Sequence, residues 1–429
     1  TSRFRLRAGG AVLGAAAGGG DLGGSLQYAD ADNLTKDEKD LPSLKDKPSL
    51  KGKPRLQAAV RQSLAHLFGE APNRIRVPAG LPIEKGGLYL GSRFVLAEEE
   101  GKAQPRPMAY HPGNDPSQPL VRVEGGYSLY RRHCLHCHGT TGDGSGPTAD
   151  YLWPRPRDYR PGKFKFTSTP GNKPTRADLR KTILQGIPNT SMPSFEAQMT
   201  AAELEQVIDY LIFLSARGET ELGLINQASV AEDEEAETAL SEDVVRDTFQ
   251  VVADAWKNAE AEVLQPPPRV PVTPESIERG RRYFLGEKGL ECAGCHGAQA
   301  DGNGPSFIDY ATFEKYVFHE GADPARFDKL REIAEKQQKR WGDDWGNPIR
   351  PADLRAGIYK GGRRPIDIYW RIANGIHGTP MPAHSTNFAS EPERIWDIVN
   401  FVLALPYEKD LLKDAKPISA TSPAAVATR

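Results

Sequence analysis

The sequence predicts a mainly helical protein that is built from two similar units. A five-residue pattern, Cys-x-x-Cys-His, occurs twice in the chain, and apolar residues at helical spacing precede and follow each copy. The chain has 429 residues, of which 38% are hydrophobic, so it can bury the cores of two or three domains rather than one.

The charge balance argues against one broad class of partner. Lys and Arg together number 55 and Asp and Glu 57, so the formal net charge is −2 and no basic excess points to nucleic acid. No apolar run of about 18 residues occurs, so the sequence predicts no transmembrane helix. Any association with a membrane is therefore expected only through a partner.

All four cysteines of the chain belong to the repeated pattern. The residues of the two motifs are Cys134, Cys137, His138, Cys292, Cys295 and His296. This pattern is typical of covalent attachment of c-type haem, in which two thiols add to the two vinyl groups on one edge of the porphyrin and the next residue ligates the iron. One helical turn spans that edge. The motifs therefore predict two covalently bound haem c groups with their iron.

Two other uses of paired cysteines fit the sequence less well. A zinc knuckle would need a second ligand pair within a gap of roughly 12–20 residues, and neither motif has one. A thioredoxin-like redox pair would not need the trailing histidine twice, and no strand-helix-strand pattern surrounds either motif.

The similarity between the two units continues after each motif. The first motif leads into HGTTGDGSGP and the second into HGAQADGNGP, with Pro147 and Pro305 nine residues after the histidine. We expect the glycines to let the backbone approach the haem, and a prolyl carbonyl to accept a hydrogen bond from the histidine Nδ1–H. The next matching stretches are PRPRDYRPGKF and IRPADLRAGIY.

Two of the four methionines occupy matching positions further along. Met192 lies in ILQGIPNTSMPSF and Met381 in RIANGIHGTPMPAH, whereas Met108 and Met199 have no such match. A small polar loop flanked by proline is a poor place for a core side chain and a good place for a ligand. On the His/Met pattern of cytochromes c, Met192 and Met381 are the predicted distal ligands of the iron.

Histidines near the second methionine are alternative ligands. His377 precedes Met381 by four residues and His384 follows it by three. Because Pro188 occupies the position of His377 in the first unit, the repeat favours Met381. We expect His136, inside the first motif, to lie at the solvent edge.

Helical patterns surround each motif. Thr200 to Glu203 and Ser390 to Glu393 each have the sequence of a capping box ahead of apolar residues at helical spacing. Tyr127 to His133 and Pro274 to Phe284 form short helical patterns before the motifs. Each unit therefore consists of a helix, the motif, a loop, a methionine loop and a terminal helix.

These residues resemble the class I cytochrome c family over about residues 120–218 and 272–408. The resemblance implies an all-α fold of two class I cytochrome c-like haem domains in tandem, in which the first and last helices of each domain cross. By position, His138 and His296 match the proximal ligands of the family, and Met192 and Met381 match its distal ligands.

The chain is similar to dihaem cytochromes c that serve bacterial respiratory complexes. The resemblance implies an electron carrier rather than an enzyme, with redox proteins or subunits of a respiratory complex as its partners. In this family haem c is attached on the outer side of the bacterial membrane, which implies a periplasmic or equivalent extracytoplasmic location.

The repeat also divides the chain. The spacing from His138 to Met192 is 54 residues, and the spacing from His296 to Met381 is 85 residues. The second unit therefore carries an insertion. Within this insertion, residues 324–341 have a charged helical pattern. The expected parts are an N-terminal extension (1–118) with a short helix, a first haem domain (119–218), an acidic and helical linker (219–271), a second haem domain (272–408) with its insertion (307–347), and a tail (409–429).

Basic and aromatic side chains after each motif have two interpretations. Arginines such as Arg160 and Arg355 suit the haem propionates, but a solvated basic surface is at least as common. We expect four aromatic residues to pack in the haem pockets, namely Trp153, Tyr159, Trp345 and Trp370.

An enzyme is the alternative function. A dihaem peroxidase or a dihaem dehydrogenase of sulfur compounds needs one iron with an open distal position. Because both units supply a methionine loop, the sequence favours the carrier. In a further alternative, a docking scaffold, the flanking regions matter more than the haems.

Overall fold

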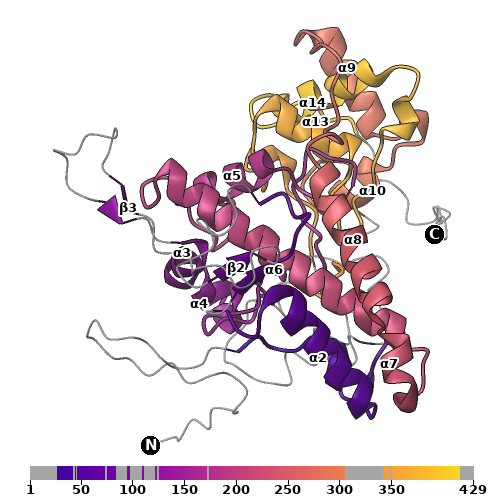
Figure 1. The fold of residues 1–429 in the computed structure, drawn as a ribbon. Helices are drawn as coiled ribbons and strands as arrows, with labels where there is room; N and C mark the ends of the chain where they lie inside the picture. The colour runs from indigo at the N-terminus through magenta and orange to yellow at the C-terminus, as the bar shows by residue number, and fades with distance from the viewer. Residues whose placement is uncertain are drawn as a thin grey trace, which may run out of the picture. The chain divides into compact units, whose positions relative to one another are not determined.

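The computed structural model of the chain is mainly helical (Figure 1). It describes residues 27–41, 44, 46–72, 75–83, 94–96, 109–110, 121–122, 125–171, 173–304, 342–347 and 349–415. Within this part the strands are short: β1 (Ile75–Val77) pairs in parallel with β2 (Phe94–Leu96), and β3 (Ala109–Tyr110) pairs antiparallel with β4 (Val121–Arg122). The mainly helical character is therefore confirmed, and the tandem haem domains stay a prediction.

The chain divides into two compact units. One consists of Thr1–Gly162 with Gln198–Lys257, and the other of Lys163–Ala197 with Asn258–Arg429. The predicted domain boundaries follow the repeat and place residues 163–197 with the first motif. Those boundaries stay a prediction.

Parts of the predicted organisation lie outside the described residues. They include residues 307–341 of the insertion, with its helical pattern at 324–341, and residues 416–429 of the tail.

The first unit is organised around its longest helix, α6 (Ala201–Ala228), which packs against α2 (Pro54–Phe68) and α3 (Gly126–His133). Helix α2 corresponds to the short helix expected in the N-terminal extension. The other helical segments described are α1 (Asp32–Thr35), α4 (Leu135–His138), η5 (Ala149–Tyr151), η6 (Asp233–Glu235), α7 (Ala236–Ala239) and α8 (Glu242–Asn258).

Helix α6 begins where the sequence predicts and ends later. Thr200 Oγ1 accepts a hydrogen bond from the Glu203 N–H (3.3 Å), and the Glu203 carboxylate accepts one from the Thr200 N–H (2.8 Å), which is the predicted capping box. The helix continues to Ala228, beyond the predicted domain end at residue 218. Phe213 of α6 and Phe249 of α8 both pack edge-on against Phe68 of α2, with ring centroids 5.7 Å apart in each pair. These rings join Phe213, within the predicted haem domain, to Phe68 and Phe249, which lie outside it.

The crossing of two helices forms the core of the second unit. Helix α9 (Pro274–Phe284) and helix α14 (Ile395–Ala404) pack closely at Gly280, where a Cβ atom would lie 2.1 Å from the Asp397 carbonyl oxygen. Only glycine allows this approach. The other helical segments described are α5 (Arg176–Gln185), η7 (Glu287–Gly289), α10 (Cys292–His296), η8 (Leu354–Ala356), α13 (Pro365–Ala373), η9 (Thr386–Phe388) and η10 (Pro392–Arg394).

The predicted capping box at Ser390 to Glu393 is wrong. The 3-10 turn η10 precedes α14, and the N-cap residue of α14, Arg394, makes no side-chain capping bond. Helix α14 therefore begins at Ile395, five residues after Ser390, and the neighbouring Glu391 carboxylate pairs with Lys288 and Arg394.

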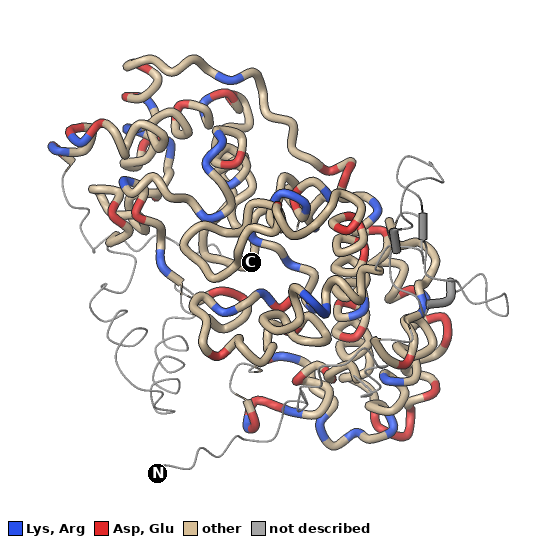
Figure 2. Tube along the Cα trace, turned by 90° about the vertical axis from the view of Figure 1, so that its left-hand side faces the viewer, with Lys and Arg blue, Asp and Glu red and all other residues tan. Residues whose placement is uncertain are grey.

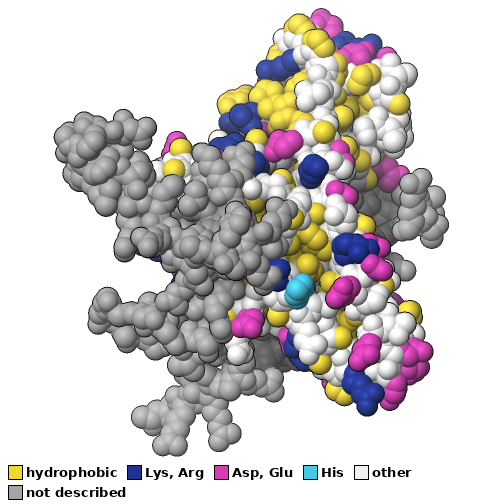
Figure 3. Space-filling model, viewed as in Figure 1, with side chains coloured by type: hydrophobic (Ala, Val, Ile, Leu, Met, Phe, Trp, Pro, Cys, Tyr) yellow, Lys and Arg dark blue, Asp and Glu magenta, His cyan; other side chains and the backbone are white. Residues whose placement is uncertain are grey.

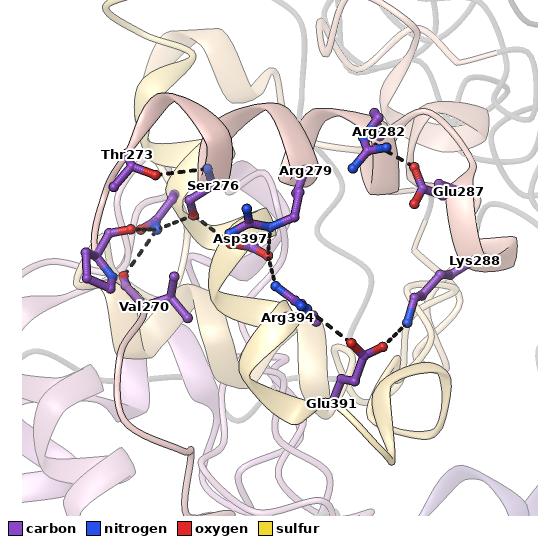
Figure 4. A network of polar contacts seen from close by, with 12 residues as sticks. Val270, Thr273, Ser276, Arg279, Arg282, Glu287, Lys288, Glu391, Arg394 and Asp397 are labelled. Atoms are coloured by element: carbon purple, nitrogen blue, oxygen red, sulfur yellow. Dashed lines mark hydrogen bonds and ion pairs between the residues drawn. The ribbon is translucent and has the colours of Figure 1, made fainter.

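A buried carboxylate joins the two crossing helices (Figure 4). Asp397 on α14 is fully buried and accepts hydrogen bonds from Ser276 Oγ (2.6 Å) and from Arg279 Nε and Nη2 (both 2.9 Å) on α9. Asn400 Nδ2 donates to Ser276 Oγ (2.9 Å). A buried charge is costly unless it is paired, and the two close bonds from the Arg279 guanidinium, with a longer contact from Arg394 Nη1 (3.7 Å), pair the Asp397 carboxylate at this crossing.

The surface is mixed in charge and chemistry. Lys and Arg alternate with Asp and Glu along the described trace (Figure 2), in keeping with the small net charge. On the face drawn in Figure 3, hydrophobic side chains gather over the upper elements, with charged side chains between them. No helix in the described part combines the length and apolarity that crossing a bilayer requires.

We predict that Arg279→Ala lowers the free energy of unfolding by about 1–3 kcal/mol, because it leaves the buried Asp397 carboxylate without its main partner. Urea unfolding followed by circular dichroism measures the change. Arg281→Ala is the matched control on the same helix: Arg281 pairs with the half-exposed Glu278, and its loss is expected to change the stability by less than about 0.5 kcal/mol. Equal effects of the two substitutions would contradict the role given to Asp397.

Candidate haem sites

Each cysteine pair and its histidine lie on one helical turn. Cys134 is the N-cap residue of α4, which ends at His138, and the second motif forms α10 (Cys292–His296). The His138 N–H donates to the Cys134 carbonyl (2.9 Å), which closes the turn. Residues three apart share one face of a helix, so both thiols of a motif lie on the same side.

Burial raises the pKa of the first thiol of each motif. All four cysteines are free, and the pKa values of Cys134 and Cys292 rise to about 12, so these two thiols stay protonated while they are unbound. A zinc site requires deprotonated sulfur. Among the described residues, no group of three or more His, Cys, Asp or Glu side chains could hold a separate metal ion.

The loop after each motif turns back onto it through the same two hydrogen bonds. One runs from a glycine N–H to the carbonyl of the motif histidine and the other from a second glycine N–H to the carbonyl of the second cysteine. The pairs are Gly144–His138 (3.0 Å), Gly302–His296 (2.8 Å), Gly146–Cys137 (3.1 Å) and Gly304–Cys295 (3.0 Å). A Cβ atom at Gly304 would lie 2.1 Å from the Gly294 carbonyl oxygen, so this return path requires glycine.

A backbone carbonyl orients each imidazole. His138 Nδ1 lies 3.1 Å from the Arg157 carbonyl oxygen, and His296 Nδ1 lies 3.0 Å from the Ala352 carbonyl oxygen. A carbonyl only accepts, so Nδ1 carries the hydrogen and Nε2 keeps its lone pair for a metal. In both repeats the acceptor is the residue after a proline, Pro156 or Pro351.

The prediction that the Pro147 carbonyl accepts the hydrogen bond from the His138 Nδ1–H is therefore wrong. The Gly-rich loop is held against the motif turn by Gly146 and by the Thr148 N–H, which donates to the His136 carbonyl (3.0 Å). The stretch that follows it reaches the imidazole instead. Pro305, the counterpart in the second unit, lies outside the described residues.

Both motif histidines are neutral at ordinary pH. Burial lowers the pKa of His138 to about 4, against the weaker opposing effect of its bond to Arg157, and burial also lowers the pKa of His296. A neutral imidazole is the form that ligates iron.

The two methionine loops have the same hydrogen bonds. The Ile187 N–H donates to the Met192 carbonyl and the Ile376 N–H to the Met381 carbonyl, both at 3.1 Å. In each loop a threonine hydroxyl donates to the isoleucine carbonyl and accepts from the methionine N–H; these residues are Thr190 (2.8 and 3.2 Å) and Thr379 (2.7 and 3.2 Å). Each loop thus carries a partly exposed methionine on a turn that is closed by hydrogen bonds.

The other predicted alternatives are placed as follows. Met199 is buried in the core, His136 is exposed, and Met108 lies outside the described residues. His377 Nε2 lies 3.3 Å from the Thr169 carbonyl oxygen, and His384 is half-buried.

The compact units separate one predicted ligand pair. His296 and Met381 belong to the same unit, whereas Met192 belongs to the unit of Lys163–Ala197 and His138 to the other. The roles of all four residues as axial ligands stay predictions.

Several of the basic residues after the motifs pair within the chain. Arg160 binds Asp158 (3.0 Å), and Arg355, its counterpart in the second repeat, binds Asp353 (3.3 Å). In both repeats the same aspartate also accepts from the backbone N–H of its arginine. These ion pairs shape the turn that carries the histidine-binding carbonyl.

Sequence reasoning missed the carbonyls that orient the histidines. They lie 19 and 56 residues from their histidines, and the only signal in the sequence is the matched Arg-Pro-x-Asp in the two stretches. Taken together, two thiols on one helical turn, an imidazole whose Nδ1 is hydrogen-bonded and a methionine loop held by hydrogen bonds are compatible with covalently attached haem.

Comparison with known proteins supports this chemistry. The family described as cytochrome C oxidase, cbb3-type, subunit III matches residues 121–211. No curated protein matches the chain. A solved structure, a reducing HAO-like protein complex of Kuenenia stuttgartiensis, is similar at 24% identity, covering 65% of this chain and 94% of that chain with a TM-score of 0.43. The family match supports a c-type cytochrome domain at residues 121–211, a class of domain that holds haem covalently and transfers electrons.

Proposed function

We propose that the chain is a dihaem c-type cytochrome that carries single electrons, with one haem on each Cys-x-x-Cys-His motif. The observation that supports this most directly is the equivalence of the two motifs. In both, the histidine Nδ1 binds the carbonyl of the residue after a proline, and the glycine loop makes the same return bonds. Because both repeats make these long-range contacts, both are expected to bind the same group.

The proposed ligand sets are His138 with Met192 and His296 with Met381. Bound haem c supplies one-electron chemistry between ferric and ferrous iron. The protein's part is to hold both thiols on one turn, to fix each imidazole with Nε2 free, and to present methionine sulfur from a tied loop. With both distal positions filled, neither site would offer the open coordination position that a peroxidase or a sulfur-compound dehydrogenase needs.

The proposed domains are the repeat units at 119–218 and 272–408. The proposed partners are redox proteins or subunits of a respiratory complex, and the matched family, whose description names an oxidase subunit, supports that class of partner. The proposed location is the periplasm or an equivalent extracytoplasmic compartment, where c-type cytochromes acquire their haem.

The number of haems is tested by removing the thiols of one motif at a time. We predict two haems per chain in the unmodified protein, and one in each of the variants Cys134→Ser/Cys137→Ser and Cys292→Ser/Cys295→Ser. Haem content per chain, from the pyridine haemochrome spectrum and the mass of the intact protein, measures this. One haem in the unmodified protein, lost in only one of the two variants, would contradict the dihaem proposal.

The axial ligands are tested separately. We predict that both ferric haems are low-spin with a methionine–iron charge-transfer band in the near infrared. Met192→Ala and Met381→Ala are each expected to remove about half of this band and to make one haem bind cyanide, because each substitution opens one coordination position.

Met199→Leu is the control for the methionine variants. Met199 is buried in the core, so this substitution is expected to leave the near-infrared band unchanged. A high-spin haem that binds cyanide in the unmodified protein would favour the dihaem enzyme instead.

A further inference from the structure

The two repeats have the same backbone hydrogen bonds near the motif histidine but carry different side chains at the matching positions. The Tyr159 N–H donates to the Gly142 carbonyl (2.7 Å), and the Leu354 N–H donates to the Ala300 carbonyl (2.9 Å). Gly142 and Ala300 both lie four residues after the motif histidine. Tyr159 therefore corresponds to Leu354, and Gly142 to Ala300.

In the first repeat an aromatic ring covers the histidine. The Tyr159 ring stacks on the His138 imidazole, with ring centroids 4.7 Å apart and an interplanar angle of 22°. Both residues are buried, with 7% of Tyr159 and 8% of His138 exposed. The imidazole thus lies against a flat apolar ring and away from water.

Gly142 makes room for that ring. A Cβ atom on Gly142 would lie 2.7 Å from Tyr159 Cδ2, so the tyrosine and the absence of a side chain at residue 142 belong together. The backbone at Gly142 has φ of +78°. Ala300 has φ of +54°, so the second repeat carries an alanine in the same left-handed turn, paired through the backbone with Leu354 in place of a tyrosine.

In the second repeat the histidine is less covered. His296 is partly buried, and its ring contact with Phe284 has a centroid distance of 6.5 Å and an angle of 47°, which is not stacking. The bond from Nδ1 to a carbonyl is nearly the same length in the two repeats, 3.1 and 3.0 Å. The repeats therefore differ in the cover of the imidazole and agree in its hydrogen bond.

We propose that Tyr159, with Gly142, is a positioning residue that raises the reduction potential at the His138 motif above the potential at the His296 motif. This rests on the proposed dihaem function. A haem iron carries one more positive charge when it is oxidised, and a dry, apolar environment around its ligand disfavours the more highly charged state. Among the described residues a ring stacks on the imidazole of the His138 motif and none stacks on that of the His296 motif, so the haem at the His138 motif accepts its electron first.

The test exchanges the two residue pairs in the full-length holoprotein. Gly142→Ala/Tyr159→Leu gives the first repeat the pair of the second, and Ala300→Gly/Leu354→Tyr makes the reciprocal change. A spectroelectrochemical titration measures both midpoint potentials. The first exchange is expected to lower the higher potential and leave the other unchanged, and the reciprocal exchange is expected to raise the lower potential.

Tyr159→Phe is the matched control. It keeps the stacked ring and removes the hydroxyl, so the higher potential is expected to stay within the error of the unmodified protein. A shift as large as that of the leucine exchange would assign the effect to the hydroxyl and overturn the role of stacking.

Two further measurements separate the possible failures. Unchanged midpoints in both exchanges, or equal shifts at both haems, with two haems per chain and the near-infrared methionine band intact, would overturn the role of Tyr159 and leave the proposed function standing. One haem per chain in the unmodified protein would overturn the proposed function and the order of potentials with it. If the first exchange fails to fold, the reciprocal exchange decides by itself.

Discussion

The hydrogen bond between each motif histidine and a distant carbonyl is the constraint on which the candidate sites depend. It determines the tautomer, because a carbonyl accepts only from a protonated Nδ1, and so leaves Nε2 as the metal-facing nitrogen. It also connects the motif turn to a stretch that lies 19 residues away in one repeat and 56 in the other. The glycine loop and the aspartate-capped turn at Asp158 or Asp353 both bring that carbonyl to the imidazole.

A shared backbone with different side chains can produce two unequal sites. The hydrogen bonds that position the histidine are the same in the two repeats, so the orientation of the imidazole is the same. The side chains at the matching position, Tyr159 and Leu354, are free to differ because the hydrogen bond that holds this position uses only main-chain atoms. A duplicated fold can thereby acquire two potentials without any change of ligands.

The segment of residues 163–197, which carries Met192, is tied into the second compact unit by contacts within that unit. Lys181 Nζ lies 2.7 Å from the Asp367 carboxylate, and the Leu264 N–H donates to the Ser168 carbonyl (3.0 Å). Burial alone would raise the pKa of Asp367, but its hydrogen bonds and ion pairs with Arg364 and Lys181 outweigh this effect and lower the pKa. The repeat in the sequence groups this segment with the first motif. Similarity between repeats indicates that the segments correspond, but it does not determine the surface on which each segment packs.

Local features of the sites were readable in the sequence. Two cysteines and a histidine within five residues lie on one helical turn whatever surrounds them, and the matching methionine loops follow from the repeat alone. The capping box at Thr200 formed as predicted, whereas the one at Ser390 did not, because a 3-10 turn (Pro392–Arg394) precedes α14 and the helix begins only at Ile395. The acceptor of each histidine and the ring stacked on His138 were decided only by the tertiary structure. They depend on where a loop returns after 19 or 56 residues, and that path is set by packing between segments that share no local pattern.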